Sequence, residues 1–126
     1  MAALRNLSSL AKKVERSPID GADVQKGAMR IPKNTAIGLD HWETRWLRRM
    51  DDEAAEGMAH LLNTIETSIA WPIQTLMNII VLMGKPQGGV RPIALMPMLF
   101  RLWTKIRKAS IDEWGYLHHG PWDAAI

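Results

Sequence analysis

The chain of 126 residues contains no cysteine, which excludes disulfide bridges and thiolate metal sites and is compatible with an intracellular, cytoplasmic or nuclear location. No apolar run approaches the length of about 20 residues that a membrane-spanning helix needs, so we expect no membrane partner. Asp and Glu are missing from residues 67–111, a stretch that carries six Lys and Arg residues, while the remainder holds ten bases against thirteen acids. The formal net charge of +3 therefore hides one contiguous cationic block. Charge segregated in this way attracts phosphate groups.

The segment 74–95 combines an apolar run with a glycine turn. Its part 76–83 is apolar and rich in β-branched side chains, which favours a short buried strand over a helix. Gly88 and Gly89 supply the positive-φ positions that a hairpin turn needs, and the chain then returns as a second short strand. Pro92 removes one ladder donor, which indicates an edge strand. We therefore expect an antiparallel hairpin here.

Two cations flank this turn. Lys85 precedes the glycines and Arg91 follows them, so both side chains are expected at the mouth of the hairpin. A guanidinium can grip two phosphate oxygens at once, and an ammonium adds a compact positive charge. The pattern indicates a site for a polyphosphate or for a nucleic-acid backbone.

Helices are expected on both sides of the hairpin. Asp51 can cap a helix over residues 52–70, where apolar side chains recur at helical spacing. Pro97 can open another helix that runs to about residue 111, with an apolar stripe and a cationic stripe on different faces. The cationic stripe consists of Arg101, Lys105 and Lys108. It can face a template strand or be an ordinary solvated surface. The expected fold class is α+β, mainly helical with one antiparallel hairpin.

The rest of the chain has weaker patterns. Residues 1–33 are interpreted as a basic N-terminal arm and linker, because the first part lacks acids and residues 17–33 mix Pro, Gly and charge without a sustained period. Residues 34–116 form the expected module, and residues 117–126 a C-terminal linker. Within the module, Trp42 and Trp46 suggest a short helix, and these rings can stack on bases or be buried against the next helix.

Several motifs together carry a family resemblance. They are Lys85-Pro86, the turn Gly88-Gly89, the strand Arg91-Pro92-Ile93-Ala94-Leu95 leading into a helix, and the upstream segment Gly38-Leu39-Asp40-His41-Trp42. The first three resemble the fingers hairpin of reverse transcriptases, which are RNA-directed DNA polymerases, especially those of non-LTR retroelements. The upstream segment is similar to the Gly-X-Asp-Gly turn of that family, with His41 in place of the second glycine. The resemblance covers residues 33–126.

The resemblance implies specific roles. Lys85 and Arg91 would hold the triphosphate of the incoming nucleotide, Gly38 and Asp40 would form the motif turn, and the cationic stripe would contact an RNA or DNA template. In the complete polymerase, the resemblance implies that Mg²⁺ is held by carboxylates of a palm domain. These lie on a strand that carries the first aspartate and on a Tyr-X-Asp-Asp hairpin, both C-terminal to the fingers. Neither occurs before Ile126. We therefore expect a module that lacks its palm partner, binds no cofactor alone and does not polymerise alone.

One alternative from another class remains. A small basic helical protein could use its cationic block to bind RNA or an acidic partner without enzymatic activity, with the hairpin similarity accidental. A self-contained hydrolase is not favoured, because the sequence shows no nucleophile paired with a base.

Overall fold

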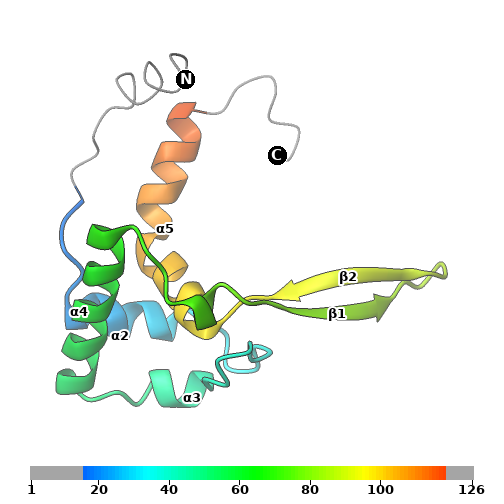
Figure 1. Cartoon of the computed structure of the whole chain (residues 1–126), viewed down its shortest axis with the longest axis horizontal. Coiled ribbons are helices and arrows are strands. Elements are labelled where there is room, and N and C mark those ends of the chain that lie inside the picture. Colours follow the sequence, from blue (N-terminus) through cyan, green and yellow to red (C-terminus); the bar gives the residue numbers. More distant parts are fainter. Residues whose placement is uncertain (1–15, 119–126) are drawn as a thin grey trace.

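The computed structural model describes residues 16–118, in which a long β-hairpin projects from a helical body (Figure 1). The elements in chain order are α2 (Gly21–Met29), α3 (Thr44–Leu47), α4 (Asp52–Ser68), the 3-10 turn η1 (Ile73–Thr75), β1 (Ile79–Gly84), β2 (Val90–Leu95) and α5 (Met98–His118). The fold therefore mixes helix and sheet, with the single antiparallel two-stranded hairpin that the sequence predicts in this part of the chain. None of the helices described is both long and apolar enough to cross a membrane.

Helix α2 lies at the centre of the body, packed against both α4 and α5. It begins with a capping box, in which the Asp20 carboxylate accepts a hydrogen bond from the Asp23 N–H at 2.8 Å and the Asp23 carboxylate accepts one from the Asp20 N–H. Val24 and Ala28 on this helix are completely buried. The interpretation of residues 17–33 as a linker or a loosely held loop is therefore wrong, because a short capped helix there supplies part of the core.

The two flanking helices form close to where they are predicted. The Asp51 carboxylate caps α4 by accepting from the Ala54 N–H at 2.8 Å, and α4 ends at Ser68. Helix α5 continues to His118, well past the predicted end near residue 111. Its glycine, Gly115, lowers helix propensity without removing a backbone donor, so it does not end the helix. The buried apolar side chains are Ile19, Val24, Ala28, Ile31, Leu47, Ala55, Met58, Ala59, Leu62, Ile65, Met98, Leu99 and Leu102.

The hairpin differs from its prediction in burial. Strand β1 begins only at Ile79, because residues 73–75 form the 3-10 turn. Its side chains are largely exposed, with Ile80 at 59% and Leu82 at 65%. The prediction of a buried strand is wrong, because the two-stranded sheet extends away from the helices and no second layer formed by residues 16–118 covers it (Figure 1). Pro92 is at an edge, as predicted, because each strand of a two-stranded sheet has only one partner.

The predicted division into arm, module and C-terminal linker is only partly covered. Residues 1–15 and 119–126 lie outside the described residues, so the arm and most of the linker do too. Of the parts described, Ile19 and α2 share the core of the module, and residues 117–118 belong to α5. The module therefore begins before residue 34.

Candidate phosphate-binding site on the hairpin

The turn of the hairpin is closed by two backbone hydrogen bonds. The Lys85 N–H donates to the Gly89 carbonyl at 2.9 Å, and the Gly88 N–H donates to the Lys85 carbonyl at 3.0 Å. The second bond closes a β-turn with Pro86 at its second position, where the fixed φ of proline is favourable. Gly88 and Gly89 follow with φ of 89° and 83°. Only glycine adopts such angles without steric cost, so the predicted glycine turn is confirmed.

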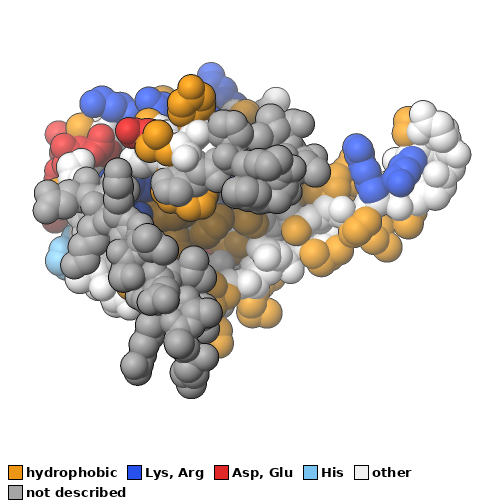
Figure 2. All heavy atoms as spheres, turned by 90° about the horizontal axis from the view of Figure 1, so that it is seen from above, with side chains coloured by type: hydrophobic (Ala, Val, Ile, Leu, Met, Phe, Trp, Pro, Cys, Tyr) orange, Lys and Arg blue, Asp and Glu red, His pale blue; other side chains and the backbone are white. Residues whose placement is uncertain are grey.

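The strand register brings the two predicted phosphate-binding cations onto one face. Arg91 lies opposite Met83, and Lys85 follows Met83 by two residues, so the side chains of Lys85 and Arg91 point to the same side of the ribbon. Diagonal neighbours in an antiparallel pair lie about 7 to 8 Å apart, within the reach of long side chains. Figure 2 shows the Lys and Arg side chains of the projecting hairpin together near its far end. Both residues are exposed, and neither side chain has an ion pair or hydrogen bond to another described residue.

The opposite face of the hairpin is apolar. It carries Ile80 and Leu82 from β1 and Val90, Pro92 and Ala94 from β2, all of them exposed. No carboxylate lies on either strand, so no negative charge within the hairpin competes for the two cations. The hairpin thus presents uncompensated positive charge at its far end.

Helix α5 engages most of the predicted template-binding stripe internally. The Arg101 guanidinium donates to the Ala36 carbonyl, and the Lys108 ammonium pairs with the Asp112 carboxylate at 2.7 Å. Lys105 is half-buried, and its side chain makes no hydrogen bond or ion pair within residues 16–118. Within the described residues, only the Lys108–Asp112 pair removes charge from the stripe, because the carbonyl that Arg101 contacts is neutral, and Arg101 is held in place without losing its charge.

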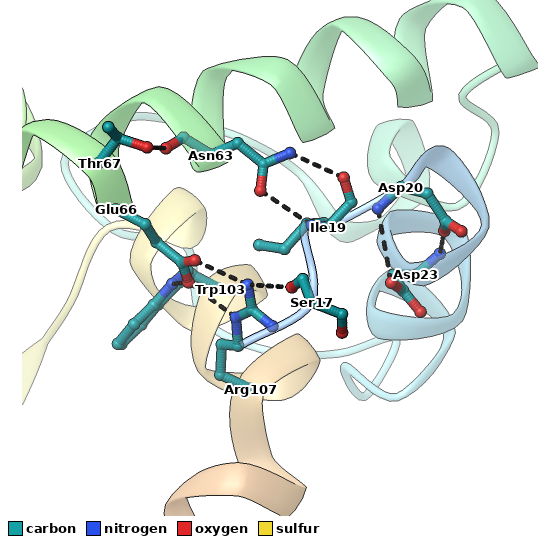
Figure 3. A network of polar contacts seen from close by, with 9 residues as sticks. All are labelled: Ser17, Ile19, Asp20, Asp23, Asn63, Glu66, Thr67, Trp103 and Arg107. Carbon is teal, nitrogen blue, oxygen red and sulfur yellow. Dashed lines mark hydrogen bonds and ion pairs between the residues drawn. The ribbon is translucent and has the colours of Figure 1, made fainter. Parts of the chain in front are cut away.

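Arg107, another base of the cationic block, is buried in a polar network between α4, α5 and the chain before α2 (Figure 3). Its guanidinium donates two hydrogen bonds of 2.7 Å to the Glu66 carboxylate and one of 3.0 Å to the Ser17 carbonyl. The Trp103 indole N–H also donates to Glu66, at 2.7 Å. Burial alone raises the pKa of the Glu66 carboxyl, but these hydrogen bonds and the charges of Arg107 and Arg16 outweigh it, so its pKa lies below the ordinary value. Arg107 is therefore a structural cation, which sequence reasoning had counted with the surface charge.

The predicted motif turn holds the start of α5. The Asp40 carboxylate accepts from the Leu99 N–H at 3.1 Å and so caps a helix that follows β2 directly. At Gly38, an added Cβ would lie 2.5 Å from the Met96 carbonyl oxygen, so only glycine fits there without a shift. The His41 N–H donates to the Gly38 carbonyl at 3.2 Å, with His41 at φ 54°. The turn thus fixes the root of the hairpin, a role that the sequence pattern did not reveal.

A metal centre is not assembled by the described residues. Nowhere in residues 16–118 do three His, Asp or Glu side chains gather closely enough to hold a metal ion. These residues therefore do not fit the Mg²⁺ that the family resemblance implies for a complete polymerase, and we derive no chemical step through it.

Comparisons with models of known protein families, with curated proteins and with solved structures gave no match to this chain. The geometry of the hairpin and of its root is therefore the basis for a functional proposal.

Proposed function

We propose that this chain is a fingers-type module of a reverse transcriptase of non-LTR retroelement type, whose hairpin contacts the triphosphate of an incoming nucleotide. One observation carries the proposal. Lys85 and Arg91 share one exposed face beside a glycine turn, and no other described residue neutralises either of them. In this role the Arg91 guanidinium takes two phosphate oxygens and the Lys85 ammonium takes a third.

The structure of the hairpin suits such a contact. Arg91 lies within β2, opposite Met83 of β1. The residues before and after it are paired with β1 as well, so the strand pairing fixes its backbone. Lys85 is fixed by the two hydrogen bonds that close the turn. Because the backbone is already ordered, binding costs mainly side-chain entropy. A charge-assisted hydrogen bond contributes about 1.5 to 3 kcal/mol in this situation.

The motif turn gives independent support. His41 has a positive φ, the conformation that favours glycine, and the family to which the segment is similar has its second glycine at this position. Asp40 is the acid of the motif, and its carboxylate caps α5. A chance resemblance in the hairpin would not account for a left-handed residue at the same place in the upstream motif.

The competing function is a basic helical protein that binds RNA through its net charge. It draws on the whole cationic block, but Arg107 is buried against Glu66 and Lys108 is paired with Asp112. Within the cationic block of residues 67–111, two of the four bases that no described acid pairs with are thus in the hairpin, against two of six bases counted from the sequence, which favours the fingers-type proposal.

The test is a titration of the purified chain with a nucleoside triphosphate at two salt concentrations. Arg91→Ala and Lys85→Ala are compared with Arg30→Ala and Lys26→Ala, which remove the same two types of exposed charge from α2 and its C-cap residue. We expect Arg91→Ala to weaken binding by about tenfold or more, because a charge-assisted contact of this kind is worth at least about 1.5 kcal/mol. The α2 variants should bind almost as the unchanged chain does. Equal losses in the hairpin and in α2 would contradict the proposal and favour binding through net charge.

A further inference from the structure

A second group of cations lies on the helical body, away from the hairpin. Four basic side chains line a hollow of about 260 Å³ between the chain that follows α2 and helix α3; they are Lys33, Arg45, Arg48 and Arg49. A neighbouring hollow of about 240 Å³ shares Lys33 and Arg45 and is also lined by Thr44 and Glu43. Each is several times the roughly 30 Å³ that one water molecule occupies in the liquid.

The charge of this lining is mostly uncompensated. Glu43 is the single acid among the lining residues of the two hollows, and it pairs with the Arg45 guanidinium at 2.6 Å. The Arg48 guanidinium donates to the carbonyls of Met29 and Ile31, at 2.9 and 2.6 Å, and keeps its full charge because carbonyls are neutral. The lining therefore bears a net charge of +3, counted from four bases and one acid.

Two buried polar groups, one on a lining residue of each hollow, lack a hydrogen-bond partner among the described residues. Thr44 is 4% exposed, and its hydroxyl Oγ1 bonds to no other group. The Nε–H of Arg48 is buried and unpartnered as well. Leaving a buried donor unsatisfied costs free energy, so such groups call for an acceptor from outside the described residues. Donors and positive charge together select an anion with several acceptor oxygens.

An exposed aromatic ring lies next to these cations. Trp46 is 55% exposed in α3, and the Arg49 N–H donates to its carbonyl at 3.1 Å. Residues three apart on a helical turn share a face, so Trp46 and Arg49 lie side by side. A base can stack on such a ring while a backbone phosphate is held beside it, a combination typical of proteins that bind single-stranded nucleic acid.

We propose that the two adjoining hollows together form a phosphate site for single-stranded nucleic acid, with a backbone phosphate among Lys33, Arg48 and Arg49 and a neighbouring base on Trp46. The Thr44 hydroxyl and the Arg48 Nε–H supply the buried donors. The site does not depend on the role proposed for the hairpin, because it uses none of the same residues. Free phosphate shares the chemistry of the backbone phosphate, and the test separates the two.

The experiment measures binding of a short fluorescein-labelled oligouridylate to the whole chain by anisotropy, over a range of salt concentrations. The variant Lys33→Ala/Arg49→Ala is compared with Lys26→Ala/Arg30→Ala, which removes one Lys from α2 and the Arg at its C-cap, whose guanidinium donates to the Lys105 carbonyl of α5. We expect a loss of at least about tenfold for the first pair only, because a single lost charge-assisted contact already weakens binding about tenfold. The slope of log K against log salt should also fall by roughly 0.7, the value for one phosphate of a single strand.

Two further variants report on the buried donor and on the base. Thr44→Val keeps the shape of the side chain and removes its unpartnered hydroxyl, so it should raise the Tm of the free chain and still weaken oligouridylate binding. A purely structural role for Thr44 would change the Tm alone. Trp46→Ala should weaken oligouridylate binding and leave the binding of inorganic phosphate unchanged.

Three results would overturn the proposal. Equal losses in the two double variants would reduce the effect to net charge. Unchanged oligouridylate binding in the first double variant, together with loss of inorganic phosphate binding, would make the two hollows a site for free phosphate. Unchanged oligouridylate binding in both Thr44→Val and Trp46→Ala would show that neither the buried hydroxyl nor the ring contacts the oligonucleotide.

Discussion

Replacement of Arg107 by Ala tests whether this base supports the fold and not a binding surface. The change removes two hydrogen bonds of 2.7 Å to the Glu66 carboxylate and one of 3.0 Å to the Ser17 carbonyl. Arg107 is 7% exposed, so Glu66 would keep a charge largely withdrawn from water, with the Trp103 indole as its remaining donor in this network. Breaking a buried pair in this way costs about 3 to 5 kcal/mol. The free energy of unfolding of a domain is about 5 to 15 kcal/mol in total, so the variant should be close to unfolding.

The assay is urea denaturation followed by circular dichroism. Lys108→Ala on the same helix is the control, because its exposed pair with Asp112 should contribute about 0 to 1 kcal/mol. The double variant Glu66→Gln/Arg107→Met should be clearly more stable than Arg107→Ala, since it leaves no buried charge without a partner. If Arg107→Ala costs no more than Lys108→Ala, the reasoning that the network holds α4, α5 and the residues before α2 together is refuted.

The same network predicts an acid dependence of stability. Because the folded pKa of Glu66 lies below its unfolded value, this group stabilises the fold above the unfolded pKa of about 4.3, and the contribution is lost as pH falls toward and through the folded pKa. Glu66→Gln should therefore flatten the loss of stability below pH about 4.3, measured as urea midpoints at several pH values. A slope identical in the variant and in the unchanged chain would contradict this assignment.

Three further predictions concern the backbone and catalysis. Ile69 is a β-branched residue at φ 53° and 91% exposed, so Ile69→Gly should stabilise the chain by about 0.5 to 1 kcal/mol in urea denaturation, and a loss of stability would contradict it. Gly38→Ala should cost about 1 to 3 kcal/mol in the same assay, because the new Cβ would meet the backbone of Met96 and Pro97; an unchanged midpoint would show that the turn is loose. Primer extension on an RNA template with magnesium should give no product, because residues 16–118 gather no set of acids able to hold a metal ion, and robust extension by the pure chain would refute it.

The sequence predicted those parts of the fold whose signals are local. The glycine turn has its two positive-φ residues at Gly88 and Gly89, and α4 has its cap at Asp51. Helix α2 was missed because it is short and its capping box uses Asp23 where the familiar pattern has Glu or Gln. The exposure of β1 was missed because an apolar run shows β-propensity, whereas its burial depends on whether another layer covers it.

The candidate site divides in the same way. Period-2 alternation and the position of the turn place Lys85 and Arg91 on one face, and that is readable from the sequence once the hairpin is assumed. Neither the pairing of Arg107 with Glu66 nor the capping of α5 by Asp40 is readable, because each joins residues far apart in the chain. The charge that remains uncompensated can be known only after such partners are identified.

The most direct test of the central claim is a nitrogen–proton NMR titration of the chain with a nucleoside triphosphate and, separately, with the corresponding monophosphate. We predict that the triphosphate shifts the Arg91 Nε–H signal and the backbone amides of Gly88 and Gly89 at concentrations where the monophosphate has little effect, because two cations on one face can engage more than one phosphate group. Shifts confined to the helical body, or equal shifts with both nucleotides, would contradict the account.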